Sequence, residues 1–155
     1  MTKVLVLGAN GYIGTYLVDS LQVRGFEVVP LTKDEFDITG ETDFNFMDFD
    51  AVFICAGKSK FIECEEDRTS YRVNVDAPLA IARRSKCLIY LSSDVVERAL
   101  HTAYGLQKAV AEVGLLAMGN VIVARICKRV SRANIAHVCK ALGDLVGKPG
   151  GLYRL

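Results

Sequence analysis

The sequence predicts an α/β domain built on a doubly wound parallel sheet. Short apolar runs typical of strands alternate with segments of helical periodicity along nearly the whole chain. The first run, Lys3 to Leu7, ends at a glycine and leads directly into a helical pattern. The chain has 155 residues, of which 51% are hydrophobic, so it can bury one substantial core. We therefore expect a single domain over residues 1–155, with ligands at the carboxyl ends of its strands.

Hydrophobic patterning places the elements in a regular order. Strands are predicted at residues 3–7, 26–31, 50–56, 86–92, 120–126 and 151–155. Helices are predicted at residues 12–24, 63–67, 70–85, 102–118 and 131–145. Gly25 is placed to end the first helix, and residues 32–49 are expected to form a loop with at most one short helix. The first strand, first helix and second strand form a βαβ unit, which implies parallel strands.

Three glycines at three-residue intervals join the first strand to the first helix. In such a joint the first glycine permits a sharp turn, the second lets the backbone approach a pyrophosphate, and the third lets the helix pack on the strand. The helix N-terminus adds unpaired N–H groups and a partial positive charge. The G-x-x-G-x-x-G spacing is one residue wider than the generic form. The residues expected to hold a nucleotide here are Gly8, Asn10, Gly11, Tyr12, Ile13 and Gly14.

A second group of residues is suited to acid–base chemistry. The fourth strand ends near Ser93, and Tyr104 and Lys108 follow four residues apart, on one face of a helix. A free tyrosine has a pKa of ~10, but a neighbouring ammonium stabilises the phenolate, so we expect Lys108 to lower the pKa of Tyr104. Tyr104 would then exchange a proton with a substrate oxygen that Ser93 aligns. The Y-x-x-x-K spacing also arises by chance, so its position after a serine-bearing strand carries the argument.

Residues after the second strand bear on the choice between NAD and NADP. An acidic residue there favours NAD, whereas a cation accommodates the additional phosphate of NADP. Thr32 followed by Lys33 slightly favours NADP(H) over NAD(H). Asp34 keeps the two nearly balanced, and the alternative is that Lys33 is only a solvated side chain.

Basic residues gather after the fifth strand, where a substrate pocket would open. Arg125, Lys128 and Arg129 could bind the diphosphate of a nucleotide, because guanidinium groups form paired hydrogen bonds with phosphate oxygens. The alternative is a solvated basic surface. Lys58, just after Gly57, is expected near the cofactor on the same grounds.

These motifs, in this order, resemble the extended branch of the short-chain dehydrogenase/reductase superfamily. That branch contains NAD(P)-dependent epimerases, dehydratases and reductases of nucleotide sugars, and the strongest resemblance is to dTDP-4-dehydrorhamnose reductase-like proteins. It implies a Rossmann-type domain, with Ser93, Tyr104 and Lys108 as the catalytic residues and Lys108 also holding the nicotinamide ribose. Further cofactor contacts are implied at Asp37, Ile38, Ala56, Gly57 and Asn74.

The chain departs from this family where its members build their substrate-binding portion. Only five residues separate Arg125 from Ser131, so the substrate-binding lobe is expected to be much reduced. Three explanations remain open: a partner subunit completes the pocket, the substrate is large and needs no lid, or turnover has been lost. Because the family dimerises through the helices matching residues 70–85 and 102–118, we expect a homodimer.

The expected function is that of an NAD(P)-dependent oxidoreductase or epimerase acting on a carbonyl or secondary alcohol, with a sugar nucleotide as the expected substrate. The alternative is a non-catalytic NAD(P)-binding redox sensor or assembly partner. Tyr104→Phe distinguishes the two, since only an enzyme has turnover to lose.

The composition of the chain gives no indication of a nucleic-acid-binding, membrane or metal-binding protein. A formal net charge of +1 gives no reason to expect binding to nucleic acid or to an anionic membrane. Five scattered cysteines without a C-x-x-C pair, together with two histidines, predict reduced thiols and no metal site. We also expect no signal peptide and no membrane-spanning segment, hence a cytoplasmic protein.

Overall fold

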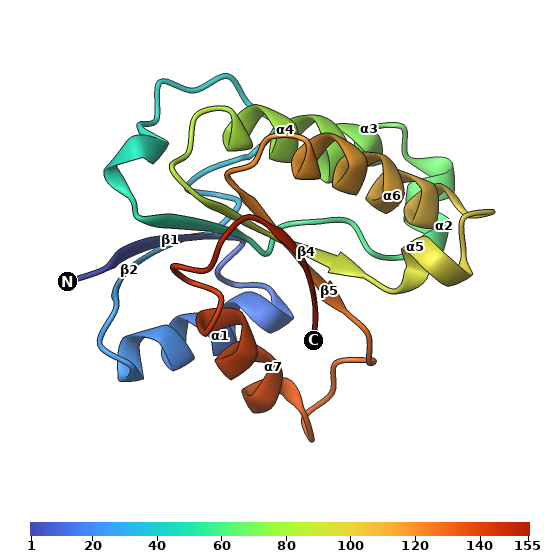
Figure 1. Cartoon of the computed structure of the whole chain (residues 1–155). Coiled ribbons are helices and arrows are strands. Elements are labelled where there is room, and N and C mark those ends of the chain that lie inside the picture. Colours follow the sequence, from blue (N-terminus) through green and yellow to red (C-terminus); the bar gives the residue numbers. More distant parts are fainter.

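The computed structural model describes all 155 residues. Its centre is a six-stranded parallel sheet with the order β2-β1-β3-β4-β5-β6 (Figure 1). The strands are β1 (Lys3–Leu7), β2 (Glu27–Leu31), β3 (Ala51–Ile54), β4 (Leu88–Ser93), β5 (Val121–Ile126) and β6 (Gly151–Arg154). The predicted α/β class and the parallel sheet are thereby confirmed.

The strand order reverses between β1 and β3. β2 lies on one side of β1 in the sheet, and β3 to β6 all lie on the other side of β1. Helices that follow β1 and β3 therefore leave in opposite directions, which opens a crevice at the carboxyl ends of these two strands. This switch point is where a parallel α/β sheet presents its ligand site.

Helices cover both faces of the sheet. On one face lie α1 (Tyr12–Val23) and α7 (Ile135–Gly143), which pack against each other below the sheet in Figure 1. On the other face lie α6 (Ala103–Leu116) and a helical segment ending in α4 (Ala77–Ala82). Alternate strand residues point to opposite faces, so Val4 and Val6 join one core whereas Leu5 and Leu7 join the other.

The helix predicted at 70–85 is present but contains a π-helical turn. It consists of α3 (Thr69–Tyr71), the π-turn η2 (Arg72–Asp76) and α4. Pro78 lacks an N–H, so a helix cannot use it to pair the carbonyl four residues earlier, at Asn74. The buried Tyr90 hydroxyl donates a hydrogen bond to this carbonyl, at 3.1 Å. A side chain from β4 thus satisfies a backbone group that the proline leaves unpaired.

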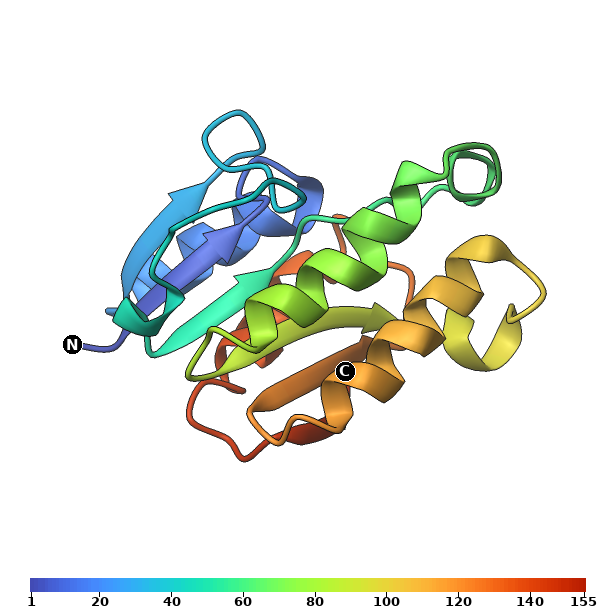
Figure 2. The same ribbon diagram turned by 90° about the horizontal axis from the view of Figure 1, so that it is seen from above.

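Short elements lie at the carboxyl edge of the sheet. These are α2 (Phe61–Glu66), which follows β3, and α5 (Val95–Arg98), which follows β4 and was not predicted. Figure 2 shows both at the end of the molecule toward which the strand arrows point. The 32–49 loop runs from the carboxyl end of β2 to the opposite edge, where it holds one 3-10 turn, η1 (Phe46–Asp48), as expected.

The last helix begins later than predicted. Residues 131–134 form a turn in which the Asn134 side-chain oxygen accepts the Ser131 N–H at 2.8 Å, so α7 starts only at Ile135. The connection from β5 to α7 comprises residues 127–134 alone, consistent with a much reduced substrate-binding lobe. None of the helices has the length and apolar character that crossing a bilayer requires.

Candidate active site

A cleft of about 820 Å³ lies at the carboxyl edge of the sheet. Its walls are the first turn of α1, the backbone after β3, the end of β4, one face of α6 and the β5–α7 connection. This is the crevice that the reversal of strand order predicts. The volume lies within the range of about 300–1,000 Å³ typical of ligand pockets.

The glycine turn has the shape of a pyrophosphate cradle. Gly8 has φ of 83°, and a Cβ there would lie 2.5 Å from the backbone nitrogen of Ala56. A Cβ on Gly14 would lie 2.2 Å from the Gly8 carbonyl oxygen. Gly11 lines the cleft and is the N-cap residue of α1, whose first-turn N–H groups therefore face an incoming anion. Only glycine at positions 8 and 14 permits so tight a turn, and this turn directs the first turn of α1 toward the cleft, an arrangement that fits the pyrophosphate of a dinucleotide.

Several other predicted cofactor residues lie in the cleft. Tyr12 and Ile13 line it from α1, and Ala56, Gly57 and Lys58 line it from the turn after β3. Asn10 is exposed within the glycine turn and does not line the cleft.

Asn74 does not face the cleft, contrary to the prediction of a direct cofactor contact. It is 1% exposed, and its side-chain amide binds the backbone of Lys58 on both sides. The amide oxygen accepts the Lys58 N–H at 2.9 Å, and the amide nitrogen donates to the Lys58 carbonyl at 2.9 Å. The residue points inward because η2 packs against α6. Asn74 therefore positions the turn after β3.

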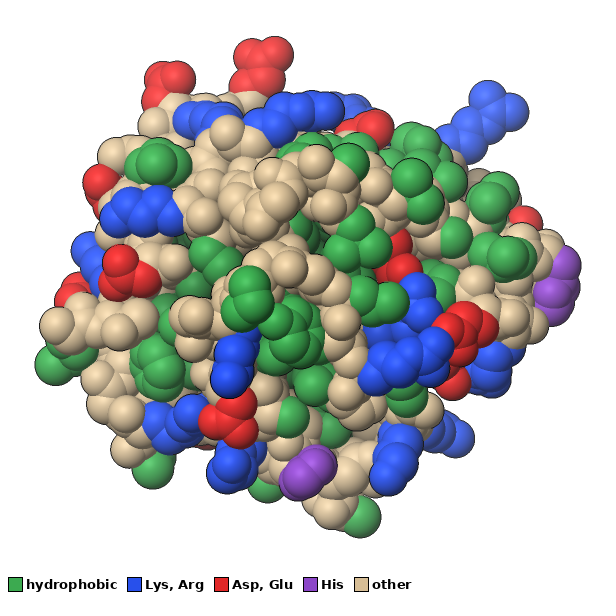
Figure 3. Space-filling view, in the orientation of Figure 1, with side chains coloured by type: hydrophobic (Ala, Val, Ile, Leu, Met, Phe, Trp, Pro, Cys, Tyr) green, Lys and Arg blue, Asp and Glu red, His purple; other side chains and the backbone are tan.

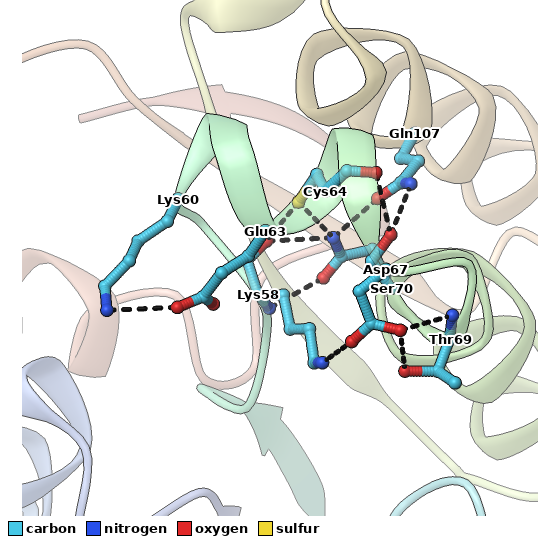
Figure 4. Close-up of polar contacts among 9 residues, drawn as sticks. Lys58, Lys60, Glu63, Cys64, Asp67, Thr69, Ser70 and Gln107 are labelled. Carbon is cyan, nitrogen blue, oxygen red and sulfur yellow. Dashed lines mark hydrogen bonds and ion pairs between the residues drawn. The ribbon is translucent and has the colours of Figure 1, made fainter.

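A polar network surrounds Asn74, and Figure 4 labels its members Lys58, Asp67, Ser70 and Gln107. The Asn74 amide nitrogen also donates to Gln107 at 2.7 Å, and Gln107 donates to the Ser70 hydroxyl at 2.8 Å. Lys58 forms an ion pair with Asp67, and this contact, with hydrogen bonds from Thr69, lowers the pKa of Asp67 to about 2. These contacts link the turn after β3 to α3 and α6, so the cleft wall has a defined conformation.

The structure brings Ser93, Tyr104 and Lys108 together in the same cleft. Ser93 is the last residue of β4, whereas Tyr104 and Lys108 lie one turn apart on α6. The Lys108 ammonium is buried, donates to the Leu91 carbonyl at 2.9 Å, and lies 4.3 Å from the centroid of the Tyr90 ring. Ammonium groups carry three donors, so two remain for other partners.

The pKa of Tyr104 moves in the direction opposite to the one expected. Burial raises it to about 12, and Lys108 does not offset this rise because its ammonium lies 6.0 Å from the ring centroid. The pKa of Lys108 is itself lowered to about 8, because burial penalises the ammonium more than Glu112 stabilises it. At neutral pH the pair is therefore a protonated phenol beside an ammonium.

Arg125 does not face the cleft, which corrects its assignment as a substrate residue. Side chains alternate along β5, so Ile126 lines the cleft whereas Arg125 points toward α6. There it forms ion pairs with Glu112 and Glu97. All three guanidinium nitrogens of Arg125 contact the carboxylates of Glu112 or Glu97, so the group is not available to bind a phosphate.

Lys128 and Arg129, the other two basic residues predicted to bind substrate, are exposed and line the cleft. Two residues at its mouth were not predicted, Phe61 from α2 and Arg98 from α5. The Phe61 ring meets the Tyr104 ring edge to face, with centroids 5.7 Å apart. No sequence pattern indicated α5, and therefore none indicated Arg98. Phe61 lies four residues after Gly57, but this spacing alone is too common to identify it as a cleft residue.

The segment after β2 lies outside the cleft. The Thr32 N–H and hydroxyl both donate to the Glu35 carboxylate, at 2.8 and 2.9 Å, while Lys33 is exposed. Asp37 accepts hydrogen bonds from Thr39, and Ile38 packs against the core. The structure thus adds Glu35, which was not singled out in the sequence, to the residues able to meet the far end of a dinucleotide.

The cysteines and the potential metal ligands give no evidence of a further reactive or metal-binding site. All five cysteines are free, and burial raises the pKa of the Cys55 thiol to about 12 and of Cys139 to about 11. No group of three or more His, Cys, Asp or Glu side chains is arranged to hold a metal ion.

Sequence relatives are sugar-nucleotide reductases. A UDP-2-acetamido-2,6-beta-L-arabino-hexul-4-ose reductase of Pseudomonas aeruginosa is 33% identical over 124 residues, covering 77% of this chain and 32% of the relative. A dTDP-4-dehydrorhamnose reductase of Mycolicibacterium smegmatis is 28% identical over 101 residues, covering 61% of this chain and 31% of the relative. The chain thus spans about a third of the length of these curated relatives.

Solved structures of the same kind share the fold. A dTDP-4-dehydrorhamnose reductase of Bacillus anthracis in complex with NADP superposes with a TM-score of 0.84 at 19% identity, covering 100% of this chain and 75% of the other. A UDP-glucose 4-epimerase of Thermus thermophilus in complex with NAD gives 0.79 at 17% identity, covering 99% and 77%.

The model of the RmlD substrate binding domain matches residues 1–128 of the 155. That span contains the glycine turn, the network around Asn74, the end of β4 and all of α6. The chain therefore belongs to the RmlD substrate binding domain family.

Proposed function

We propose that this protein is an NAD(P)-dependent oxidoreductase that reduces a keto group on a sugar nucleotide. One observation carries the proposal: Ser93, Tyr104 and Lys108 line the same cleft as the glycine turn. The sequence relatives that match this chain are reductases of UDP- and dTDP-linked sugars, which supports the substrate class.

The protonated state of Tyr104 is suited to the reducing direction. Because burial raises its pKa to about 12, the phenol keeps its proton at neutral pH and can donate it to a carbonyl oxygen that is being reduced. A reduced nicotinamide bound in the cleft would supply the hydride. Ser93 lies at the cleft wall, where its hydroxyl can hold the same oxygen.

Lys108 has two roles in this proposal. Its ammonium is fixed by the Leu91 carbonyl and retains two donors for ribose hydroxyls. Its positive charge also stabilises the phenolate that forms when Tyr104 gives up its proton, since an opposite charge favours the ionised form. Gly8, Gly11 and Gly14 form the tight turn that would hold the pyrophosphate, and Tyr12 and Ile13 line the cleft beside this turn.

The test combines cofactor binding with turnover. Fluorescence titration should detect binding of NADH or NADPH, and absorbance should report nicotinamide oxidation with a UDP- or dTDP-linked 4-keto sugar. Tyr104→Phe should lower the turnover rate by about 10²-fold or more and leave the affinity for the cofactor unchanged. If the wild type binds the cofactor and turns over none of these sugars, the alternative of a non-catalytic sensor or assembly partner gains support. The short β5–α7 connection is the observation that favours that alternative.

We further propose that the protein forms a homodimer through α6 and the helix that begins at α3. Leu106, Val110 and Val113 form an exposed apolar stripe on α6, and Val113 is 75% exposed. Hydrophobic side chains gather over this part of the surface, at the upper right of Figure 3. Sedimentation velocity at micromolar concentration should give a dimer, and Val113→Glu should shift it to a monomer.

A further inference from the structure

A second cavity lies beside the cleft. It is a groove of about 530 Å³ between α2 and the segment that joins α5 to α6. Phe61 and Ile62 form one wall, and Ala99, His101 and Thr102 form the other. None of the predicted site residues lines it.

The groove adjoins the cleft. Phe61 and Arg98 line both cavities, so a ligand passing between them leaves the cleft over the edge of Tyr104. Phe61 is the junction, because its ring packs edge to face on the Tyr104 ring. A substrate whose reacting oxygen meets Tyr104 can therefore extend into the groove.

We propose that this groove binds the nucleoside end of the substrate. The inference rests on the proposed function, which requires a sugar joined through a diphosphate to a nucleoside. The cleft must hold the nicotinamide end of the cofactor and the sugar, so the nucleoside needs a separate place. The connection after β5 is short and adds no lobe for it, whereas the groove is contiguous and has a volume suited to a small-molecule ligand.

The chemistry of the walls fits a planar base with both hydrogen-bond donors and acceptors. Phe61 is 47% exposed and Ile62 is 71% exposed, so each offers an apolar surface to a ring. The exposed Glu66 carboxylate can accept an N–H from the base edge, and His101 can donate to a base carbonyl. Pyrimidine bases such as uracil and thymine carry both kinds of group.

The junction is suited to the diphosphate. Arg98 lies there, and it is held only by the Asp94 carboxylate four residues earlier, at 2.8 Å, with 64% of its side chain exposed. Exposed pairs of this kind are weak, so the guanidinium can turn to phosphate oxygens. Lys128 and Arg129 line a different wall of the cleft and provide the competing route for the diphosphate.

The experiment measures binding of UDP by calorimetry in the presence of saturating cofactor. Phe61→Ala should weaken UDP binding about tenfold, because base stacking is lost. Ile62→Ala, which alters the groove alone, should weaken it severalfold. Inorganic pyrophosphate, which has no base, should bind both variants as it binds the wild type. Val23→Ala removes an exposed apolar side chain on α1, outside both cavities and outside the proposed dimer surface, and serves as the matched control.

Cofactor titration separates this inference from the proposed function. If NADPH or NADH binds and UDP binds equally well to wild type, Phe61→Ala and Ile62→Ala, the groove proposal is overturned while the cofactor site stands. Loss of UDP binding only in Lys128→Ala or Arg129→Ala would likewise overturn it and place the nucleoside on the other wall. If the wild type binds neither cofactor nor UDP, both proposals fail.

Discussion

Glu112 and Arg125 form a two-point ion pair between α6 and β5. The Arg125 Nε donates to one carboxylate oxygen at 3.1 Å, and a second guanidinium nitrogen contacts the other oxygen. The Ser92 hydroxyl donates to the same carboxylate at 2.5 Å. Only 6% of the Glu112 side chain and 11% of the Arg125 side chain are exposed. Glu112 shares a face of α6 with Lys108 and Tyr104, so these contacts fix the helix that carries both groups.

Removing Glu112 should destabilise the fold strongly. Glu112→Ala leaves the Arg125 guanidinium buried with Glu97 as its remaining partner, and breaking a buried pair in this way costs about 3–5 kcal/mol. Urea denaturation followed by circular dichroism measures the free energy of unfolding. Lys140→Ala breaks an exposed pair with Asp144 and should cost less than about 1 kcal/mol. Equal losses for the two variants would show that the Glu112 pair contributes no more than a surface contact.

The charge of Lys108 should depend on Glu112. Burial lowers the pKa of Lys108 to about 8, and Glu112 opposes this by raising it. The ammonium is therefore present below about pH 8 and is lost as the pH rises through that value. Glu112→Gln removes the opposing charge, so the pKa of Lys108 should fall further. An NMR titration of the lysine side chain measures this directly, with Glu97→Gln as the control because Glu97 does not act on Lys108. An unchanged or higher pKa in Glu112→Gln would contradict the assignment.

The glycine turn should lose cofactor affinity when Gly14 gains a side chain. Gly14→Ala places a Cβ 2.2 Å from the Gly8 carbonyl oxygen, so the turn or α1 must move. We expect at least tenfold weaker NAD(P)H binding by fluorescence titration, since the N–H groups of the first turn are displaced. Gly40→Ala is the matched control, because its Cβ meets only the Asp37 carbonyl at 3.4 Å. Wild-type affinity in Gly14→Ala would show that the turn does not hold the phosphates.

The position of Asn74 predicts an indirect effect on the cofactor. Asn74→Ala removes both hydrogen bonds to the Lys58 backbone, so the turn after β3 should loosen and NAD(P)H binding should weaken severalfold. Asn120→Ala removes two similar bonds, to the carbonyls of Ala82 and Ser85, at the opposite edge of the sheet. This control should lower the free energy of unfolding and leave cofactor affinity unchanged. A cofactor affinity that falls equally in both variants would mean that Asn74 acts only through global stability.

Local patterns were sufficient to predict the sheet and the glycine turn. The spacing of Gly8, Gly11 and Gly14 predicts their role. Gly11 and Gly14 lie close to the Gly8 carbonyl a few residues earlier, although the approach of Gly8 to Ala56 is a long-range contact that the spacing does not reveal. Likewise, Tyr104 and Lys108 share a helix face through their four-residue separation. Side chains repeat their direction every two residues in a strand and every 3.6 residues in a helix, so the sequence alone shows which residues share a face.

Assignments that depend on side-chain direction were less accurate. The sequence does not show that Arg125 points toward Glu112 and away from the cleft. This direction depends on the register of β5 beside β4. Asn74 faces inward because a π-turn shifts the helix phase near Pro78. The pKa of Tyr104 depends on burial by α2 and α5, two short elements whose docking is a tertiary effect.

Cofactor preference should respond to Glu35. Hydrogen bonds from the N–H and the hydroxyl of Thr32 lower the pKa of Glu35, so its carboxylate is ionised at neutral pH directly after β2. A 2′-phosphate placed there meets this negative charge as well as the exposed Lys33. Glu35→Gln should therefore strengthen NADPH binding severalfold and leave NADH binding nearly unchanged, whereas Lys33→Gln should weaken NADPH binding.

Paired titrations of NADH and NADPH at low and high salt measure this balance. The effect of Glu35→Gln on the NADPH dissociation constant should shrink as salt increases, because exposed charges are screened. Asp34→Asn removes a neighbouring exposed carboxylate that lacks the Thr32 contacts, and it should change the NADPH-to-NADH ratio less. If Asp34→Asn and Glu35→Gln shift the ratio equally, only the net charge of the loop matters. If neither shifts it, the 2′ position lies beyond the reach of this loop.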